Sequence, residues 1–186
     1  DDTVDAGGGN NTVTIGDGSG TVVTGAGNDK ITVGTGAHTI DAGGGNNTIT
    51  TGDGDQQVSA GDGNDTITTG AGNDTVNAGN GNNTVKTGAG NDTITAGSGN
   101  DTINGRGGFD RADYNVDPAT TSGINVQLAA GIVTGDASIG TDTLLSVEAV
   151  RGTNFADTYD ATGFSGVSAN AGSNGTFNEF TGNGGN

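Results

Sequence analysis

The sequence contains no cysteine, methionine or tryptophan, and only one proline and one histidine. Without cysteine the protein has no disulfides, no thiolate nucleophile and no cysteine-ligated zinc. Basic residues are also scarce: five Lys and Arg stand against 22 Asp and Glu, for a formal net charge of −17. Nucleic acids and anionic membranes are therefore excluded as expected partners, because both bind cationic surfaces.

Long apolar runs are missing as well. Hydrophobic residues make up 28% of the chain, and no run approaches the roughly 20 apolar residues of a membrane-spanning helix. Glycine, by contrast, accounts for 40 of the 186 residues, about three times its usual share. A helical bundle is excluded, because each glycine inside a helix costs about 1 kcal/mol.

The sequence has instead a repeat of nine residues. Twelve consecutive blocks run from Ala6 to Asp113 without an insertion. Glycine occupies the second place of the first eleven blocks and the fourth place of all twelve, and the eighth place is always apolar. Paired glycines permit a tight turn with positive φ. The alternation Thr-Ile-Thr, as at residues 66–68, is typical of a very short β-strand.

One block therefore supplies one turn and one strand, and two blocks close a coil of eighteen residues. Coils stacked at ~4.8 Å build two parallel sheets that face each other. We expect the eighth-place side chains to point inward and their Thr, Asn and Lys neighbours to face water. The predicted fold class is all-β, a parallel β-roll or β-solenoid with two nine-residue repeats per coil and a β-rich capping segment at the C-terminal end.

The sixth place of each block is the candidate for a charged ligand. It is occupied by aspartate in six blocks, at Asp29, Asp65, Asp74, Asp92, Asp101 and Asp110. The other six blocks have Asn11, Gly20, His38, Asn47, Gln56 and Asn83 there. Asp and Asn favour turns for conformational reasons alone, so an ordinary solvated turn residue is the alternative interpretation of each aspartate.

Residues eighteen apart lie in adjacent coils on the same edge of the roll. We therefore expect Asp74, Asp92 and Asp110 to stack in one column, whereas Asp65 and Asp101 flank an asparagine on the opposite edge. Stacked carboxylates repel each other, and the core of this chain is thin. Ca²⁺ binds 6–8 oxygens from carboxylates and carbonyls, so it would relieve the repulsion and convert binding free energy into folding free energy.

The blocks resemble the nonapeptide repeats of the RTX (repeats-in-toxin, haemolysin-type calcium-binding) family, G-G-x-G-x-D-x-U-x. The best copies run from Gly61 to Ile67 and from Gly97 to Ile103. The resemblance covers residues 6–113 well. It implies a right-handed parallel β-roll with Ca²⁺ held between stacked turns, type I secretion, and a location outside the cell or on its surface.

The candidate calcium ligands are therefore the six sixth-place aspartates, Asp29, Asp65, Asp74, Asp92, Asp101 and Asp110. We expect the best-occupied sites between the turns at 69–74, 87–92 and 105–110, and weaker sites at Asp65 and Asp101. An ion at Asp29 would depend mostly on backbone carbonyls. The turns at 20, 38 and 56 are expected to hold none.

After Asp113 the nine-residue repeat stops. Residues 124–128 alternate as a strand, and the apolar run 142–150 is suited to cover the open end of the roll. Residues 151–159 resemble a degraded repeat with Asp157 and Tyr159 in the acidic and apolar places. The predicted division is a calcium-binding roll over 1–113 and a β-rich cap or connector over 114–186 that leads into a further repeat. We interpret the chain as an excerpt of a longer repetitive protein.

Motifs for catalysis are not found in the sequence. The chain has no H-E-x-x-H, G-x-S-x-G or phosphate-binding loop, and its single histidine has no partners for a zinc or catalytic site. We therefore expect no enzyme activity, but a calcium-binding structural module of a secreted or surface protein: a spacer, adhesin, surface-layer or filament component. Its partners would be calcium, cell-surface components or copies of itself.

Two alternatives remain open at this stage. The segment could be the C-terminal folding and secretion domain of an RTX protease, lipase or epimerase. It could also bind ice through outward threonines such as those at 12, 14, 48 and 50, although Lys30 and Lys86 interrupt that row.

The ranking of the acidic turns gives a first prediction. Asp92→Ala should reduce the number of calcium ions bound per chain more than Asp29→Ala, because Asp92 has acidic neighbours on both sides and Asp29 has none. Native mass spectrometry in calcium measures the difference. Equal losses, or a larger loss for Asp29→Ala, would refute the ranking.

Overall fold

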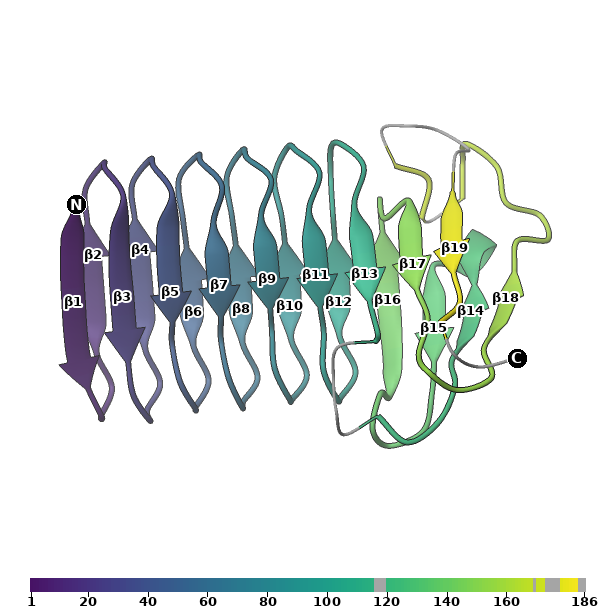
Figure 1. Cartoon of the computed structure of the whole chain (residues 1–186), viewed down its shortest axis with the longest axis horizontal. Helices are drawn as coiled ribbons and strands as arrows, with labels where there is room; N and C mark the ends of the chain where they lie inside the picture. The colour runs from purple at the N-terminus through teal and green to yellow at the C-terminus, as the bar shows by residue number, and fades with distance from the viewer. Residues whose placement is uncertain (116–119, 169, 173–177, 184–186) are drawn as a thin grey trace.

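The computed structural model describes residues 1–115, 120–168, 170–172 and 178–183. Two long sheets lie face to face and wind along one axis, and a broader end is formed by the C-terminal strands (Figure 1). The molecule is all-β, and its parallel strands form a β-solenoid of about six turns, as predicted from the repeat.

Within the described residues one sheet has nine strands. In spatial order they are β1 (Asp2–Gly7), β3 (Gly20–Thr24), β5 (His38–Asp41), β7 (Gln57–Ser59), β9 (Thr75–Asn77), β11 (Thr93–Thr95), β13 (Arg111–Asp113), β17 (Ala149–Arg151) and β19 (Glu179–Thr181).

The facing sheet has ten strands in the same described ranges. In spatial order they are β18 (Thr158–Asp160), β14 (Asn125–Gln127), β15 (Ile132–Thr134), β16 (Thr141–Leu145), β12 (Thr102–Asn104), β10 (Thr84–Lys86), β8 (Thr66–Thr68), β6 (Thr48–Thr50), β4 (Lys30–Val33) and β2 (Thr12–Ile15). A 3₁₀ turn, η1 (Leu128–Ala130), links β14 to β15.

The register follows the eighteen-residue coil. Ile31, for example, pairs with Ile49, and Ile49 with Ile67, each in parallel. These eighth-place residues are fully buried. A second inward row lies at the first place of the following block, as at Ala60 and Ala78, because residues two apart on a strand share a face. The nine-residue pattern did not predict this second row, which consists mostly of Ala and Thr together with Ile15 and Val33.

Fourth-place glycines set how closely the turns stack. All twelve have positive φ, from 99° at Gly9 to 146° at Gly27. At Gly63 an added Cβ would also lie 2.2 Å from the carbonyl oxygen of Gly45 in the neighbouring coil. The position therefore excludes other residues twice, by its backbone conformation and by the close approach of the next turn.

The roll continues past the end of the repeats. β16 pairs in parallel with β12, and β17 pairs in parallel with β13, so residues 141–151 form a further coil over the last core residues. The apolar run at 142–150 thus covers the end of the repeats as expected. Between β13 and β16 in the sequence, β14 and β15 form an antiparallel hairpin. The predicted strand at 124–128 is β14, shortened because Leu128 begins η1.

The degraded repeat at 151–159 also forms a strand. β18 pairs in parallel with β14, and the Tyr159 ring stacks on Phe180 from β19 with centroids 4.8 Å apart. The further repeat expected at the end of the chain includes residues 184–186, which lie outside the described residues.

Threonines line the outer face of the ten-stranded sheet in register. Thr48 and Thr66 are paired neighbours there, but Lys30 precedes them in the same row and Lys86 stands in the parallel row. The arrangement agrees with the interrupted threonine rows expected from the sequence.

The stacking of the turns predicts an asymmetry between glycines. Gly63→Ala should lower the free energy of unfolding by about 2 kcal/mol or more, because alanine resists positive φ and its Cβ would meet the carbonyl of Gly45. Gly44→Ala is the matched control: its Cβ has only one ordinary contact, at 3.8 Å, so it should leave stability unchanged or slightly raised. Thermal unfolding in saturating calcium compares them, and equal effects would contradict the account.

Candidate calcium-binding turns

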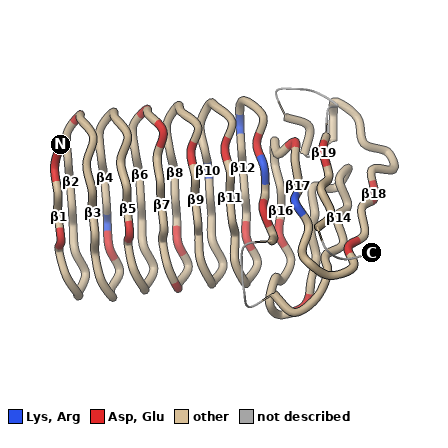
Figure 2. Tube along the Cα trace, viewed as in Figure 1, with Lys and Arg blue, Asp and Glu red and all other residues tan. Residues whose placement is uncertain are grey.

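The sixth-place side chains form two columns, one along each edge of the roll. From Asp29 to Asp110 none is more than 2% exposed. The alternative interpretation of the aspartates as solvated turn residues is therefore wrong: each side chain points under its own turn, away from water. Figure 2 shows acidic residues spread along the whole roll, with basic residues at few positions.

We name the two columns by their composition. The mixed column precedes the strands of the ten-stranded sheet. It contains Asn11, Asp29, Asn47, Asp65, Asn83, Asp101 and Asp142. The acidic column precedes strands of the nine-stranded sheet. It contains Asp74, Asp92, Asp110 and Glu148.

Each column is joined by head-to-tail hydrogen bonds. One side-chain oxygen accepts the backbone N–H of the residue one coil earlier: Asp65 Oδ1 accepts from Asn47 at 2.6 Å, and Asp92 Oδ1 accepts from Asp74 at 2.8 Å. All six aspartates predicted from the sequence make this bond. The structure therefore brings them together in the expected order, with Asp65 and Asp101 on either side of Asn83.

The second oxygen of most of these carboxylates is left without a partner. Buried Oδ2 atoms that accept no hydrogen bond from the described residues are those of Asp29, Asp65, Asp92, Asp101 and Asp110. A buried unpaired carboxylate is costly unless it is protonated or binds a cation. Asp74 differs, because the Thr69 hydroxyl donates to its Oδ2 at 2.5 Å.

The pKa values of these carboxyls reflect the burial. Loss of solvent raises the pKa of Asp65 to about 6 and that of Asp101 to about 8, and the Asp142 carboxylate adds to the shift at Asp101. Burial also raises the pKa of Asp74 and of Asp110, the latter beside the carboxylates of Asp92 and Glu148. A proton or a metal ion at these turns would offset the cost of burying the charged carboxylates.

Backbone carbonyls supply further ligands. The asparagine turns show which carbonyls face the second side-chain atom: Asn83 Nδ2 donates to the carbonyls of Gly79 and Gly81, at 3.1 and 3.3 Å. In the aspartate turns a carboxylate oxygen takes the place of that amide. Carboxylate and carbonyl oxygens are the ligands that Ca²⁺ prefers, so the residues present fit a calcium ion.

Side chains alone do not complete such a site. Over the ranges that the structure describes, no three His, Cys, Asp or Glu side chains gather into a metal-binding group. An ion in these turns therefore needs one or two carboxylates together with the carbonyls of stacked glycines, which is why the close stacking of the turns matters for binding.

Two members of the columns were not predicted as ligands. Asp142 Oδ1 accepts the N–H of Asp101, and Glu148 Oε2 accepts that of Asp110, both at 2.9 Å. They follow their partners by 41 and 38 residues instead of 18, because the β14–β15 hairpin intervenes. The sequence does contain a signal for these two residues, the D-x-U part of the repeat without its glycines. It is present as Asp-Thr-Leu at 142–144 and, with Glu in the acidic place, as Glu-Ala-Val at 148–150.

The two added acids differ in their free oxygens. Asp142 Oδ2 accepts a hydrogen bond from the buried Tyr114 hydroxyl at 2.9 Å. Glu148 Oε1 has no partner in the described part of the chain, and this side chain is 1% exposed. Glu148 therefore extends the acidic column as a candidate ligand beside Asp110.

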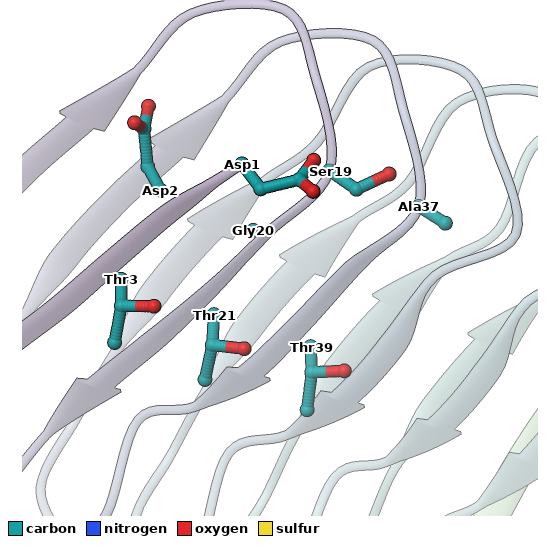
Figure 3. Close-up of a pocket in the computed structure, with 8 residues that line it drawn as sticks. All are labelled: Asp1, Asp2, Thr3, Ser19, Gly20, Thr21, Ala37 and Thr39. Carbon is teal, nitrogen blue, oxygen red and sulfur yellow. The ribbon is translucent and has the colours of Figure 1, made fainter.

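The turns expected to hold no ion have other groups in the same position. Gln56 Nε2 donates to the carbonyls of Gly36 and Gly54, at 2.7 and 3.0 Å. Gly20 has no side chain, and a shallow hollow of about 300 Å³ lies there, bordered by Thr3, Thr21 and Thr39 in a row (Figure 3). Its acidic residues, Asp1 and Asp2, are exposed, so the hollow lacks the buried carboxylate oxygen of the other turns.

The fold and the two columns define a class, the parallel β-solenoids with calcium-binding turns. The family model of the RTX calcium-binding nonapeptide repeat matches this chain in four copies, over residues 1–13, 14–49, 50–85 and 78–112. These copies cover more than half of the sequence, and the chain belongs to this family. None of the curated proteins matches it. No helix in the described ranges is long and apolar enough to cross a membrane.

The raised pKa values predict how the metal-free protein responds to pH. Asp65, Asp101 and Asp142, with pKa values of about 6, 8 and 7, keep protons that the unfolded chain has lost above its ordinary value of 3.8. Their contribution to stability is therefore present at low pH and lost as the pH rises through about 6 to 8. Without calcium, the folded fraction of the chain should therefore fall as the pH rises from 5.5 to 8.5.

Two matched variants, Asp101→Asn and Asp62→Asn, test whether the buried carboxyls of the mixed column cause this pH dependence. Asp101→Asn, which removes the carboxyl facing Asp142 and Tyr114, should flatten the dependence of the metal-free folded fraction on pH. Asp62→Asn removes one carboxyl from an exposed turn position and should leave that dependence unchanged. Circular dichroism at a series of pH values in metal-depleted buffer provides the measurement. A metal-free folded fraction that rises over the same interval would be inconsistent with the burial of these carboxyls.

Proposed function

We propose that this chain is a structural module that folds when it binds calcium outside the cell, and that it has no catalytic role. The observation that carries the proposal is the set of buried carboxylate oxygens, repeated from coil to coil, that accept no hydrogen bond from the described residues. Calcium bound at these oxygens would offset their burial and link consecutive coils.

The acidic column explains why folding would depend on the ion. Asp74, Asp92 and Asp110 follow each other in adjacent coils, and Glu148 stands next in line. Neighbouring carboxylates at this spacing repel each other when ionised, and the burial of each adds a further cost. Without a cation this edge therefore opposes folding at neutral pH. With calcium, each ion would bridge ligands of successive turns.

The same property supports a role in export. Where free calcium is scarce, the net charge of −17 and the thin core would keep the chain extended. At the 10⁻⁴–10⁻³ M affinities typical of extracellular calcium modules, folding would begin only outside the cell. RTX repeats typically occur in secreted proteins, and we infer type I secretion and a place in a secreted or surface protein as a spacer, adhesin, surface-layer or filament segment.

A calcium titration tests this function. The chelated chain should lack most of its β ellipticity at pH 7.5 and should gain it cooperatively as calcium is added, because ions in the acidic column bridge adjacent coils. Circular dichroism and calorimetry follow the transition, and magnesium at equal concentration should be much less effective because it demands tighter octahedral geometry. A chelated sample with full ellipticity and an unchanged melting temperature would refute the proposal.

A further inference from the structure

The mixed column alternates between amide and acid. Asparagine stands at 11, 47 and 83, and aspartate at 29, 65 and 101. Both residue types make the same head-to-tail bond through Oδ1: Asp65 donates its N–H to Asn83, and Asn83 donates its N–H to Asp101. The two kinds of turn therefore share one backbone arrangement and differ only at the second side-chain atom.

In the asparagine turns that second atom is a donor with partners. Asn11 Nδ2 donates to the carbonyls of Gly7 and Gly9, at 2.9 and 2.8 Å. Asn47 Nδ2 donates to Gly45 at 3.0 Å and reaches the carbonyl of Ala60 in the next coil at 3.1 Å. The amide thus fills the space under the turn and, at Asn47, joins two coils.

In the aspartate turns the equivalent atom is Oδ2, a hydrogen-bond acceptor, and the carbonyls that bond the amide in the asparagine turns are acceptors too. The Oδ2 atoms of Asp29, Asp65 and Asp101 are buried and have no partner among the residues that the structure describes. Carbonyls cannot donate to them, so only a proton or a cation satisfies this position. The same place in the repeat thus carries a positive partial charge in one coil and requires a positive charge in the next.

We propose that the side-chain amides of Asn11, Asn47 and Asn83 replace a calcium ion, so that this column holds ions only at Asp29, Asp65 and Asp101. The inference rests on the proposed calcium binding of the aspartate turns. Each amide supplies donors to the carbonyls that an ion would otherwise attract. Gln56, on the other edge, bonds in the same way to the carbonyls of Gly36 and Gly54, which is an independent instance of the same substitution.

The spacing of the ions follows from this assignment. Ions in the mixed column would lie two coils apart, about 9.6 Å at ~4.8 Å per coil, with an amide-bonded turn between them. Ions in the acidic column would lie in consecutive coils. One edge of the roll would therefore bind calcium at separate sites and the other as a continuous row.

Exchange of the two residue types tests the proposal on the full chain. Asn83→Asp should bind one calcium ion more than the wild type, because it keeps the Oδ1 acceptor and exchanges the amide for an oxygen. Asp65→Asn should bind one ion fewer, and in chelated buffer it should keep a larger folded fraction than the wild type, because an amide then satisfies its turn. Native mass spectrometry counts the ions, and circular dichroism measures the folded fractions.

Asn82→Asp is the matched control. It adds the same charge one residue away, but its side chain is exposed and keeps its acceptor role toward Asn100, so its ion count should equal that of the wild type. If the wild type binds calcium while Asn83→Asp gains no ion, or Asp65→Asn is less stable than the wild type without calcium, the amide substitution is wrong. If the wild type binds no calcium, the proposed function itself fails.

Discussion

The structure depends on one constraint: carboxylates are buried beneath the acidic turns, and most of them accept a hydrogen bond through only one of their two oxygens. The occupied oxygen accepts a backbone N–H from the neighbouring coil and fixes the register of the stack. The other oxygen is buried and has no donor among the described residues in five of the predicted aspartates, Asp29, Asp65, Asp92, Asp101 and Asp110. The same carboxylate thus fixes the register through one oxygen and leaves the other oxygen without a donor. A coil that stacks in register therefore also creates a position suited to a cation.

Glycine makes this arrangement possible. At Gly63 the neighbouring coil approaches so closely that a Cβ would lie 2.2 Å from the Gly45 carbonyl. The same approach brings carbonyl oxygens of two turns together beside the sixth-place side chain, where an ion can bind several of them. The high glycine content is therefore required for the close stacking of the turns as well as for their positive φ.

Amide and acid turns show how a repeat can vary its dependence on the ion without a change of fold. Asn83 and Asp65 occupy equivalent places and make the same bond through Oδ1, yet only the aspartate leaves an unpaired charge. On the proposed assignment, calcium sites would be distributed unequally along the two edges. The acidic column, continued by Glu148 outside the repeats, would concentrate them toward the C-terminal end of the roll.

The nine-residue period by itself determined the two-sheet roll, the inward Val and Ile residues and the stacking order of the six aspartates, because a strict repeat leaves one way to superpose its coils. Only the tertiary structure showed that the sixth-place side chains are buried and which of their oxygens lack donors, since both depend on the neighbouring coil. It also placed Asp142 and Glu148 in the columns, because a hairpin interrupts the period and their distance along the sequence no longer indicates their distance in space.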